Sequence, residues 1–343
     1  MTFGMAVCGL STGLAMRQLH PLGLGIAKAV AQDINYFRIG AGIVGSRLYQ
    51  LAGTLAGAIT NPPGSAPCDD HSACGVPDLI GLAQTTTGSV ENLQALAEGN
   101  VESGVVQADM AADSIAGTGP FKAAGPDGGL RCLARLSQSV VHILVPMQSP
   151  ATKIADLKGK TVGVGPKTGD SASIGQKLLA AHGLSGRKVK LDFGELQATI
   201  AAFQNGSIDA LIVADGLPSA DIASLAGRIG IRFLPLDDAA VKRLQQQLPV
   251  LEAATIPADA YKRTDSADTV AVPILWAVSA NLDKGLAFAL VKALWGQTEQ
   301  IANRVKPEAD LDIEMASDSN PLELHPGAVA FYQGRKSTAP STN

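Results

Sequence analysis

The chain has 343 residues, of which 46% are hydrophobic and only 4% aromatic, and it contains 37 glycines. This length exceeds what one core usually fills, so two lobes are expected, and the hydrophobic content excludes a disordered chain. The formal net charge of −4 and the lack of a Lys/Arg-rich run argue against a nucleic-acid partner.

Residues 1–31 have the composition of an export signal. Residues 1–16 carry no charge, Arg17 follows them, and an A-x-A-type cleavage site ends at Ala31. We therefore predict cleavage after Ala31 and a mature protein that is soluble in the periplasm. A buried N-terminal helix is the alternative, and the sequence does not decide whether the segment is cleaved or serves as an anchor. No later segment has the roughly 18 uncharged apolar residues that a membrane span needs.

Cys68 and Cys74 enclose five residues next to a stretch of turn formers at 61–67. In an oxidising compartment a disulfide closing this small loop is expected. With His71 the two cysteines could also be metal ligands, but a fourth ligand of standard spacing is missing, so no metal site is predicted. Cys132 lies in an apolar run and is expected to be a buried thiol.

The rest of the chain alternates between strand-like and helix-like segments with short loops between them. This alternation predicts an α/β fold with parallel sheets covered by helices on both faces, in which ligands bind at the carboxyl ends of strands. Expected strands cover 36–40, 79–83, 101–108, two pieces within 130–146, 161–165, 188–192, 210–214 and 231–234, and residues 270–278 form a long apolar run. Expected helices cover 46–59, 90–97, 174–179, 197–205, 220–226 and most of the chain after 278.

Two loops share a construction that suits anion binding. The sequences TTTGS at 85–89 and KTGDS at 167–171 each precede an amphipathic helical segment. The backbone N–H groups and the partial positive charge at a helix start can hold an anion, so we expect the two loops to bind one anionic solute from two sides. Two ordinary helix N-caps are the alternative interpretation.

Residues 40–45 read GAGIVG, the pattern of flavin- and nicotinamide-binding turns. The confirming context is missing, because the second strand of such a unit would fall on the proline-rich segment 61–68. An FAD- or NAD-dependent oxidoreductase that uses Gly40 to Gly45 is therefore kept as the alternative function. No nucleophile elbow or HExxH motif occurs, and His142 lies in an apolar run typical of a core, so no catalytic residue and no cofactor are predicted.

The order of several short motifs resembles that of the TAXI-type solute receptors, the extracytoplasmic binding proteins of one branch of the tripartite ATP-independent periplasmic (TRAP) transporters. Each motif is short, and the set lies in the expected order across residues 36–333. The segments are 39–49, TGSVEN at 87–92, VQAD at 106–109, ADLKGK at 155–160, GSIDA at 206–210, LPLD at 234–237 and LHPGA at 324–328.

This resemblance implies a type II periplasmic-binding-protein fold, with two α/β lobes joined by a two-segment hinge. Lobe 1 is expected at 32–146 plus 272–343 and lobe 2 at 147–271. The implied function is that of a non-enzymatic receptor, which captures a small organic anion (a dicarboxylate, a 2-oxo acid or an acidic amino acid) and delivers it to the membrane subunits of a secondary transporter. Ile43 and Val44 stand where the family has small hydroxyl residues, and Thr87 replaces a usual glycine, which indicates a less polar or differently placed solute.

Most residues expected to bind the solute come from the family's motif positions. Those carried over are Gly42, Val44, Ser46, Tyr49, Thr87, Gly88, Ser89, Gln107, Asp109, Thr168, Gly169 and Ser171. Lys167 is added because it lies in the second loop and could pair with a carboxylate, and Asp215 is added because it ends an expected strand. Arg47 is considered as a second basic candidate or as a solvated helix end. The exact solute, the oligomeric state and the surface that docks the transporter are not predicted.

Overall fold

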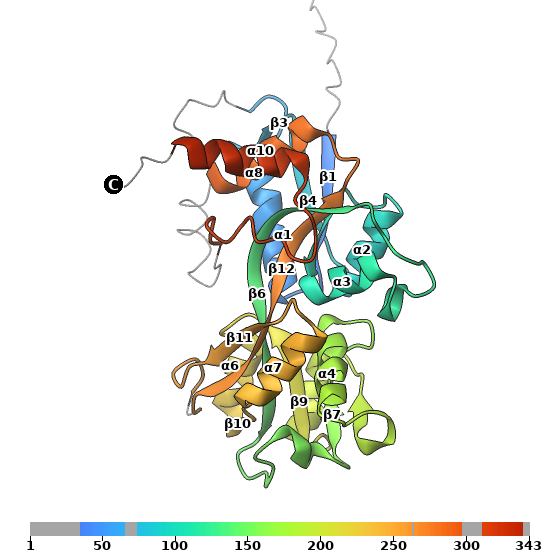
Figure 1. Ribbon diagram of the computed structural model, residues 1–343. Coiled ribbons are helices and arrows are strands. Elements are labelled where there is room, and N and C mark those ends of the chain that lie inside the picture. The colour runs from blue at the N-terminus through green and yellow to red at the C-terminus, as the bar shows by residue number, and fades with distance from the viewer. Residues whose placement is uncertain (1–34, 66–73, 263, 297–310, 339–343) are drawn as a thin grey trace, which may run out of the picture. The chain divides into compact units, whose positions relative to one another are not determined.

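Figure 1 shows the computed structural model, which describes residues 35–65, 74–262, 264–296 and 311–338. The predicted export signal at 1–31 and the residue Cys68 lie outside the described residues. Cleavage of the signal and the Cys68–Cys74 disulfide therefore stay predictions. Within the described ranges, no helix is both long and apolar enough to cross a membrane.

Helices and strands alternate along the chain. The strands are β1 (Asn35–Gly40), β2 (Thr60–Asn61), β3 (Val76–Pro77), β4 (Leu79–Gln84), β5 (Ser103–Gln107), β6 (Leu130–Pro146), β7 (Thr161–Gly163), β8 (Lys190–Asp192), β9 (Ala210–Asp215), β10 (Ile231–Phe233), β11 (Glu252–Ile256) and β12 (Ala267–Ser279). The α-helices are α1 (Arg47–Ile59), α2 (Ser89–Ala97), α3 (Ala108–Ala116), α4 (Asp170–Ala181), α5 (Leu196–Gln204), α6 (Ala220–Arg228), α7 (Asp238–Gln247), α8 (Lys284–Gly296) and α10 (Pro326–Thr338).

The strands form one mixed sheet that contains the same arrangement twice. Its order is β3-β2-β4-β1-β5-β12-β6-β9-β7-β8, with β10 paired to β6 and β11 paired to β12. In the first arrangement, parallel β4, β1 and β5 are followed by antiparallel β12. In the second, parallel β8, β7 and β9 are followed by antiparallel β6. In each arrangement the strand that comes first in the chain lies in the middle: β1 lies between β4 and β5, and β7 lies between β8 and β9.

The two arrangements are joined by the long strands β6 and β12, which change partners along their length (Figure 1). β6 pairs with β12 as far as Val140 and from there with β9 and then β10. β12 pairs with β11 up to Ala271 and then with β6 and β5. We call the part around β1–β5 the first lobe and the part around β7–β11 the second lobe. The topology confirms the expected α/β class and the type II periplasmic-binding-protein fold, with two lobes joined by two segments.

Several elements differ from the sequence expectation. The two strand pieces expected within 130–146 are one continuous strand, and the strand expected at 101–108 ends at Gln107. Ala108 begins α3, a helix that the sequence did not predict and that ends at the left-handed Gly117 (φ 63°). The helix α7 and the strand β11 were also not predicted. These segments are short, so neighbours elsewhere in the fold outweigh their weak local preference.

Helices cover both faces of each lobe's sheet. Helices α1 and α8 enclose one apolar core of the first lobe, in which Leu51 and Trp276 are fully buried. A second core runs under α2, α3, α4 and α7, and a third lies under α5 and α6. Cys132 is fully buried as predicted, and burial raises the pKa of its thiol to about 12. These cores hold the strand ends, and hence the loops that follow them, in fixed positions.

Candidate functional site

A cavity of about 180 Å³ lies where the loops of the two lobes meet. The loops that follow β1, β4 and β7 contribute to its wall, together with the ends of β5 and β9 and the starts of α1, α5 and α6. The carboxyl ends of the parallel strands of both lobes therefore face one cavity, as expected for ligand sites in such sheets. The lining residues are Gly42, Ile43, Val44, Ser46, Arg47, Leu48, Thr87, Gly88, Gln107, Gly165, Pro166, Gly169, Asp170, Ser171, Glu195, Leu196, Gln197, Val213, Ala214, Asp215 and Asp221.

Most of the residues predicted from the sequence to bind the solute come together in this cavity. Those that line it are Gly42, Val44, Ser46, Thr87, Gly88, Gln107, Gly169, Ser171 and Asp215. Tyr49, Ser89, Asp109, Lys167 and Thr168 are not among its lining residues. A shared location does not test binding, so the binding role of the first set remains a prediction.

The five residues outside the lining have evident structural reasons for their positions. Ser89 and Asp109 are fully buried and engaged with other residues of the protein. Lys167 and Thr168 are exposed, and Tyr49 packs against the core beneath α1. The second loop therefore presents Gly169, rather than its lysine or threonine, to the cavity.

The start of α1 is occupied by a carboxylate of the second lobe. Ser46 caps the helix by accepting a hydrogen bond from the backbone N–H of Tyr49 at 3.3 Å. The backbone N–H of Arg47 donates to Oδ1 of Asp215 at 3.1 Å. The Arg47 side chain is only 5% exposed, and its Nη2 donates to Ser137 Oγ at 2.9 Å. Arg47 is thus a buried residue of the cavity wall and not a solvated helix end.

Asp215 is held in place by a chain of hydrogen bonds. Ser219 Oγ donates to Asp215 Oδ2 at 2.8 Å, and the backbone N–H of Ser219 donates to the Tyr261 hydroxyl at 2.7 Å. That hydroxyl in turn lies 2.7 Å from Nε2 of His142. His142 is fully buried, and burial lowers its pKa to about 4, so the ring is neutral at pH 7 and serves as the core residue expected from the sequence. Loss of water raises the pKa of Asp215.

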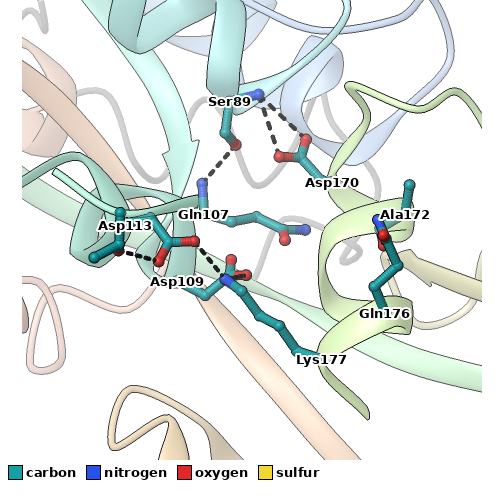
Figure 2. Close-up of polar contacts among 9 residues, drawn as sticks. Ser89, Gln107, Asp109, Asp113, Asp170, Ala172, Gln176 and Lys177 are labelled. Carbon is teal, nitrogen blue, oxygen red and sulfur yellow. Dashed lines mark hydrogen bonds and ion pairs between the residues drawn. The ribbon is translucent and has the colours of Figure 1, made fainter. Parts of the chain in front are cut away.

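The start of α2 is occupied in the same way by Asp170, the first residue of α4 (Figure 2). The N-cap residue Gly88 has a φ of 128° and offers no side chain to the helix. Instead the backbone N–H of Ser89 donates to both carboxylate oxygens of Asp170, at 3.2 and 3.4 Å. A Cβ atom at Gly88 would lie 2.7 Å from Asp170 Oδ2, so glycine is required both for its φ and for this close approach.

Gln107 is a buried side chain with unused hydrogen-bonding capacity. Its backbone N–H donates to Ser89 Oγ at 2.8 Å, which fixes the end of β5 against the start of α2. The side chain is fully buried and lines the cavity, yet neither Nε2 nor Oε1 has a hydrogen-bond partner among the described residues. In Figure 2 the amide extends into the space between the two lobes. A buried amide of this kind is costly unless a ligand or water completes its hydrogen bonds.

Acidic groups dominate the charge of the cavity. Its lining contains four carboxylic acids, Asp170, Glu195, Asp215 and Asp221, against the single basic residue Arg47. Part of the Asp170 surface stays exposed, but its carboxyl group is enclosed by the protein. Loss of water, opposed by the hydrogen bond from Ser89, raises the pKa of Asp170 to about 7. Apolar residues such as Leu48, Leu196 and Val213 form the rest of the wall.

Sequence reasoning did not identify Asp170 as a site residue, although it lies within the second loop. An acid at the start of a helix is ordinary, because it interacts favourably with the helix dipole of its own helix. Nothing in the local pattern showed that this carboxylate would instead cap α2 in the other lobe. The one sequence feature that could have indicated this contact is Gly88, because a glycine leaves room for an atom from elsewhere in the fold.

The dinucleotide-binding alternative finds no support. The turn at 40–45 does connect β1 to α1, but the next parallel strand, β4, ends at Gln84 and not at an acid that could bind a ribose. Asp215 also occupies the start of α1, where a pyrophosphate would bind. Within the described part of the chain, no cluster of three or more His, Cys, Asp or Glu residues is suited to a metal ion.

A family model described as the NMT1-like family matches residues 39–334, which is most of the chain. The chain belongs to the NMT1-like family. Solved structures are similar to this family member in overall fold. The alkanesulfonate-binding protein SsuA from Xanthomonas axonopodis pv. citri, bound to MOPS, has 18% identity and a TM-score of 0.48, covering 89% of this chain and 85% of its own.

Two further structures are similar at a comparable level. The periplasmic aliphatic sulphonate binding protein SsuA from Escherichia coli has 16% identity and a TM-score of 0.44, covering 87% of this chain and 78% of its own. The arginine-, lysine-, histidine-binding protein ArtJ from Geobacillus stearothermophilus has 14% identity and a TM-score of 0.45, covering 78% of this chain and 91% of its own. At these identities the similarity does not identify the solute of this NMT1-like protein.

Proposed function

We propose that this NMT1-like protein is a solute-binding receptor that holds a small solute in the cavity between its lobes. The observation that carries the proposal is the amide of Gln107, which is fully buried, lines the cavity and has no hydrogen-bond partner among the described residues. A solute seated in the cavity would complete its hydrogen bonds. The cavity draws on both lobes, so a bound solute would also bridge them, as in hinge closure.

The lining residues favour binding over catalysis. Histidine, cysteine and lysine do not occur among them. Ser171 Oγ accepts a hydrogen bond from the backbone N–H of Ala214 at 3.0 Å, and Ser46 Oγ caps α1, so both hydroxyls have structural tasks. A nucleophile with an adjacent base, the arrangement that hydrolytic catalysis needs, is not formed by this lining. We therefore propose a non-enzymatic protein that needs no cofactor.

The cellular setting is proposed from the sequence. The resemblance to TAXI-type receptors supports a periplasmic protein that delivers its solute to the membrane subunits of a TRAP-type transporter. The proposed lobes are 32–146 plus 272–343 and 147–271, and the strand partners change near these limits, at Val140 and Ala271.

The sequence predicts a small organic anion as the solute, and the cavity disfavours a solute whose only charge is negative. Two first-lobe helix starts at the cavity, those of α1 and α2, are taken by carboxylates of the protein itself. An anion at these two helix starts would have to displace Asp170 or Asp215, or lie beside them at a cost in repulsion. The receptor proposal therefore covers any small solute, and the charge of that solute is argued below.

A ligand screen on the purified protein tests the receptor proposal. Amino acids, amines, organic acids, sulfonates and sugars are added singly, and the melting temperature is measured; a solute at 100 times its Kd stabilises by about 2.7 kcal/mol. Gln107→Leu then serves as the diagnostic variant for each hit. Because the amide has no described protein partner, this change should leave the stability without solute near that of the wild type, yet weaken binding at least tenfold.

The proposal is contradicted if no small solute binds, or if Gln107→Leu leaves the affinity of every hit unchanged. A protein that purifies yellow, or with a nucleotide bound, would restore the oxidoreductase alternative.

A further inference from the structure

Asp170 and Asp215 fill two positions that are suited to a solute's anionic group. Each carboxylate comes from the second lobe and accepts a backbone N–H at the start of a first-lobe helix, α2 for Asp170 and α1 for Asp215. Such helix starts attract anions through their free N–H groups and partial positive charge. The protein therefore supplies the carboxylate at these two helix starts itself, and both acids line the cavity.

These acids retain the capacity to accept further hydrogen bonds. A carboxylate offers about four lone-pair sites on its two oxygens. Asp170 accepts hydrogen bonds from the backbone N–H and the side chain of Ser89. Asp215 accepts from the N–H of Arg47, the hydroxyl of Ser219 and the backbone of Gly216. An ammonium group brings three donors and one positive charge, and it would use this remaining capacity.

The amide of Gln107 is an independent sign that a polar ligand group belongs in this place. It is fully buried, lines the same cavity as Asp170 and has both polar atoms unpaired among the described residues. Its Oε1 can accept from an ammonium group, and its Nε2 can donate to a neighbouring acceptor of the solute. The lining also includes the apolar residues Leu48, Leu196 and Val213, which suit a hydrocarbon body.

We infer that the cavity selects solutes that carry a protonated amine on a small apolar body, and that Asp170 is the residue that determines this selection. The inference rests on the proposed receptor function. Asp170 acts twice: its charge attracts the ammonium group, and its position at the start of α2 denies that site to a carboxylate of the solute.

Binding of such a solute should be linked to the protonation of Asp170. Burial raises the pKa of Asp170 to about 7, so a nearby ammonium group should drive the proton off near neutral pH. The charged groups around it come from both lobes. They are Asp109, Asp113 and Lys177 at α3 and α4, and Arg47, Glu195, Asp215 and Asp221 in the cavity wall. Lys177 already pairs with Asp109 and Asp113, so its positive charge does little to stabilise the ionised form of Asp170.

A matched five-carbon series tests the selection by charge. Pentylamine, norvaline, pentanoate and glutarate share the chain length and differ in their charged groups. Isothermal titration calorimetry at pH 7.5 should show binding of pentylamine or norvaline and at least tenfold weaker binding of pentanoate and glutarate. In two buffers of different ionisation enthalpy, the amine should release protons on binding.

Asp170→Asn is the decisive variant, because asparagine keeps the shape and can still accept from the Ser89 N–H. It should weaken binding of the amines at least tenfold and strengthen binding of glutarate. Glu98→Gln, at the exposed far end of α2, is the matched control and should change neither. Melting curves of both variants establish that they fold.

The outcomes separate this inference from the receptor function. Tighter binding of pentanoate or glutarate than of either amine overturns the inference and leaves the receptor proposal standing. Unchanged amine affinity in Asp170→Asn overturns the role of Asp170. Failure of both amines to bind overturns the selection by charge, and the broad ligand screen then decides separately whether the protein is a receptor at all.

Discussion

The ammonium group of Lys177 on α4 donates to Oδ2 of the fully buried Asp109 on α3 at 2.9 Å (Figure 2). The same nitrogen lies 2.8 Å from Asp113 Oδ2, so one lysine of the second lobe joins two acids of the first. The sequence predicted Asp109 as a solute ligand. In the structure, its Oδ2 accepts from Lys177 and so helps to join the lobes, whereas its buried Oδ1 has no hydrogen-bond partner among the described residues.

Lys177→Met should destabilise the protein by about 3 kcal/mol, because it leaves the Asp109 carboxylate buried without its cation. Urea unfolding followed by circular dichroism measures the change. Lys160→Met is the control, since Lys160 pairs with Asp209 at 3.3 Å at the surface, where both side chains are more than 40% exposed. That change should cost less than about 1 kcal/mol. Equal effects of the two substitutions would show that the Lys177 pair is not structural.

The stability of the protein should fall with rising pH between the pKa of Asp170 in the unfolded chain and its higher pKa in the folded protein. The folded protein keeps the Asp170 proton up to a pKa of about 7, whereas the unfolded chain releases it near 3.8. Between these values the folded state binds more protons, so its stability is fully present below about pH 4 and is lost as the pH rises to about 7. Asp170→Asn removes this dependence and should stabilise the protein at pH 8, on the order of 2 kcal/mol.

To check this prediction, the urea midpoints of wild type and Asp170→Asn are measured from pH 4 to pH 8. The difference between the two proteins at each pH isolates Asp170, because the other titrating groups contribute equally to both. His142 changes stability in the opposite direction, because its pKa is lowered, and it contributes equally to both proteins. A difference that is constant across the pH range would mean that Asp170 titrates normally in the folded state.

The sequence sufficed to predict the strand–loop–helix units of the site, and it failed where contacts join distant segments. Glycine and hydroxyl residues between an apolar strand and an amphipathic helix are local signals, so the loops at 85–89 and 167–171 were placed correctly at the strand ends. The contact between Ser89 and Asp170 joins residues 81 positions apart, and no spacing rule encodes it. Whether a loop residue faces the cavity or solvent, as with Gly169 and Lys167, depends on the neighbouring lobe.

The predicted export signal and disulfide can be tested together by intact mass of the protein recovered from the periplasm. A chain that begins at Gln32, with Cys68 and Cys74 resistant to alkylation until a reductant is added, is the expected result. Cys132 should stay unreactive in the folded protein, because it is fully buried and its thiol pKa is raised to about 12. Loss of the disulfide should cost roughly 1–3 kcal/mol, since the loop is short. A chain that begins at Met1 with every thiol free would contradict both predictions.

Ser89→Ala and Thr168→Ala should differ sharply, although the two hydroxyls occupy similar places in the sequence of the two loops. Ser89 is fully buried, and its Oγ accepts the backbone N–H of Gln107 at 2.8 Å; the alanine leaves this N–H buried without an acceptor. We expect a loss of stability of about 1–3 kcal/mol.

Gln107 also loses the contact that fixes it at the cavity wall, so solute affinity should fall as well. Thr168 is exposed and outside the cavity lining, so Thr168→Ala should change neither quantity. Thermal unfolding and calorimetry of the two variants, with a solute found in the ligand screen, measure both effects. Weakened binding in Thr168→Ala with unchanged stability would mean that the second loop contacts the solute through its hydroxyl after all.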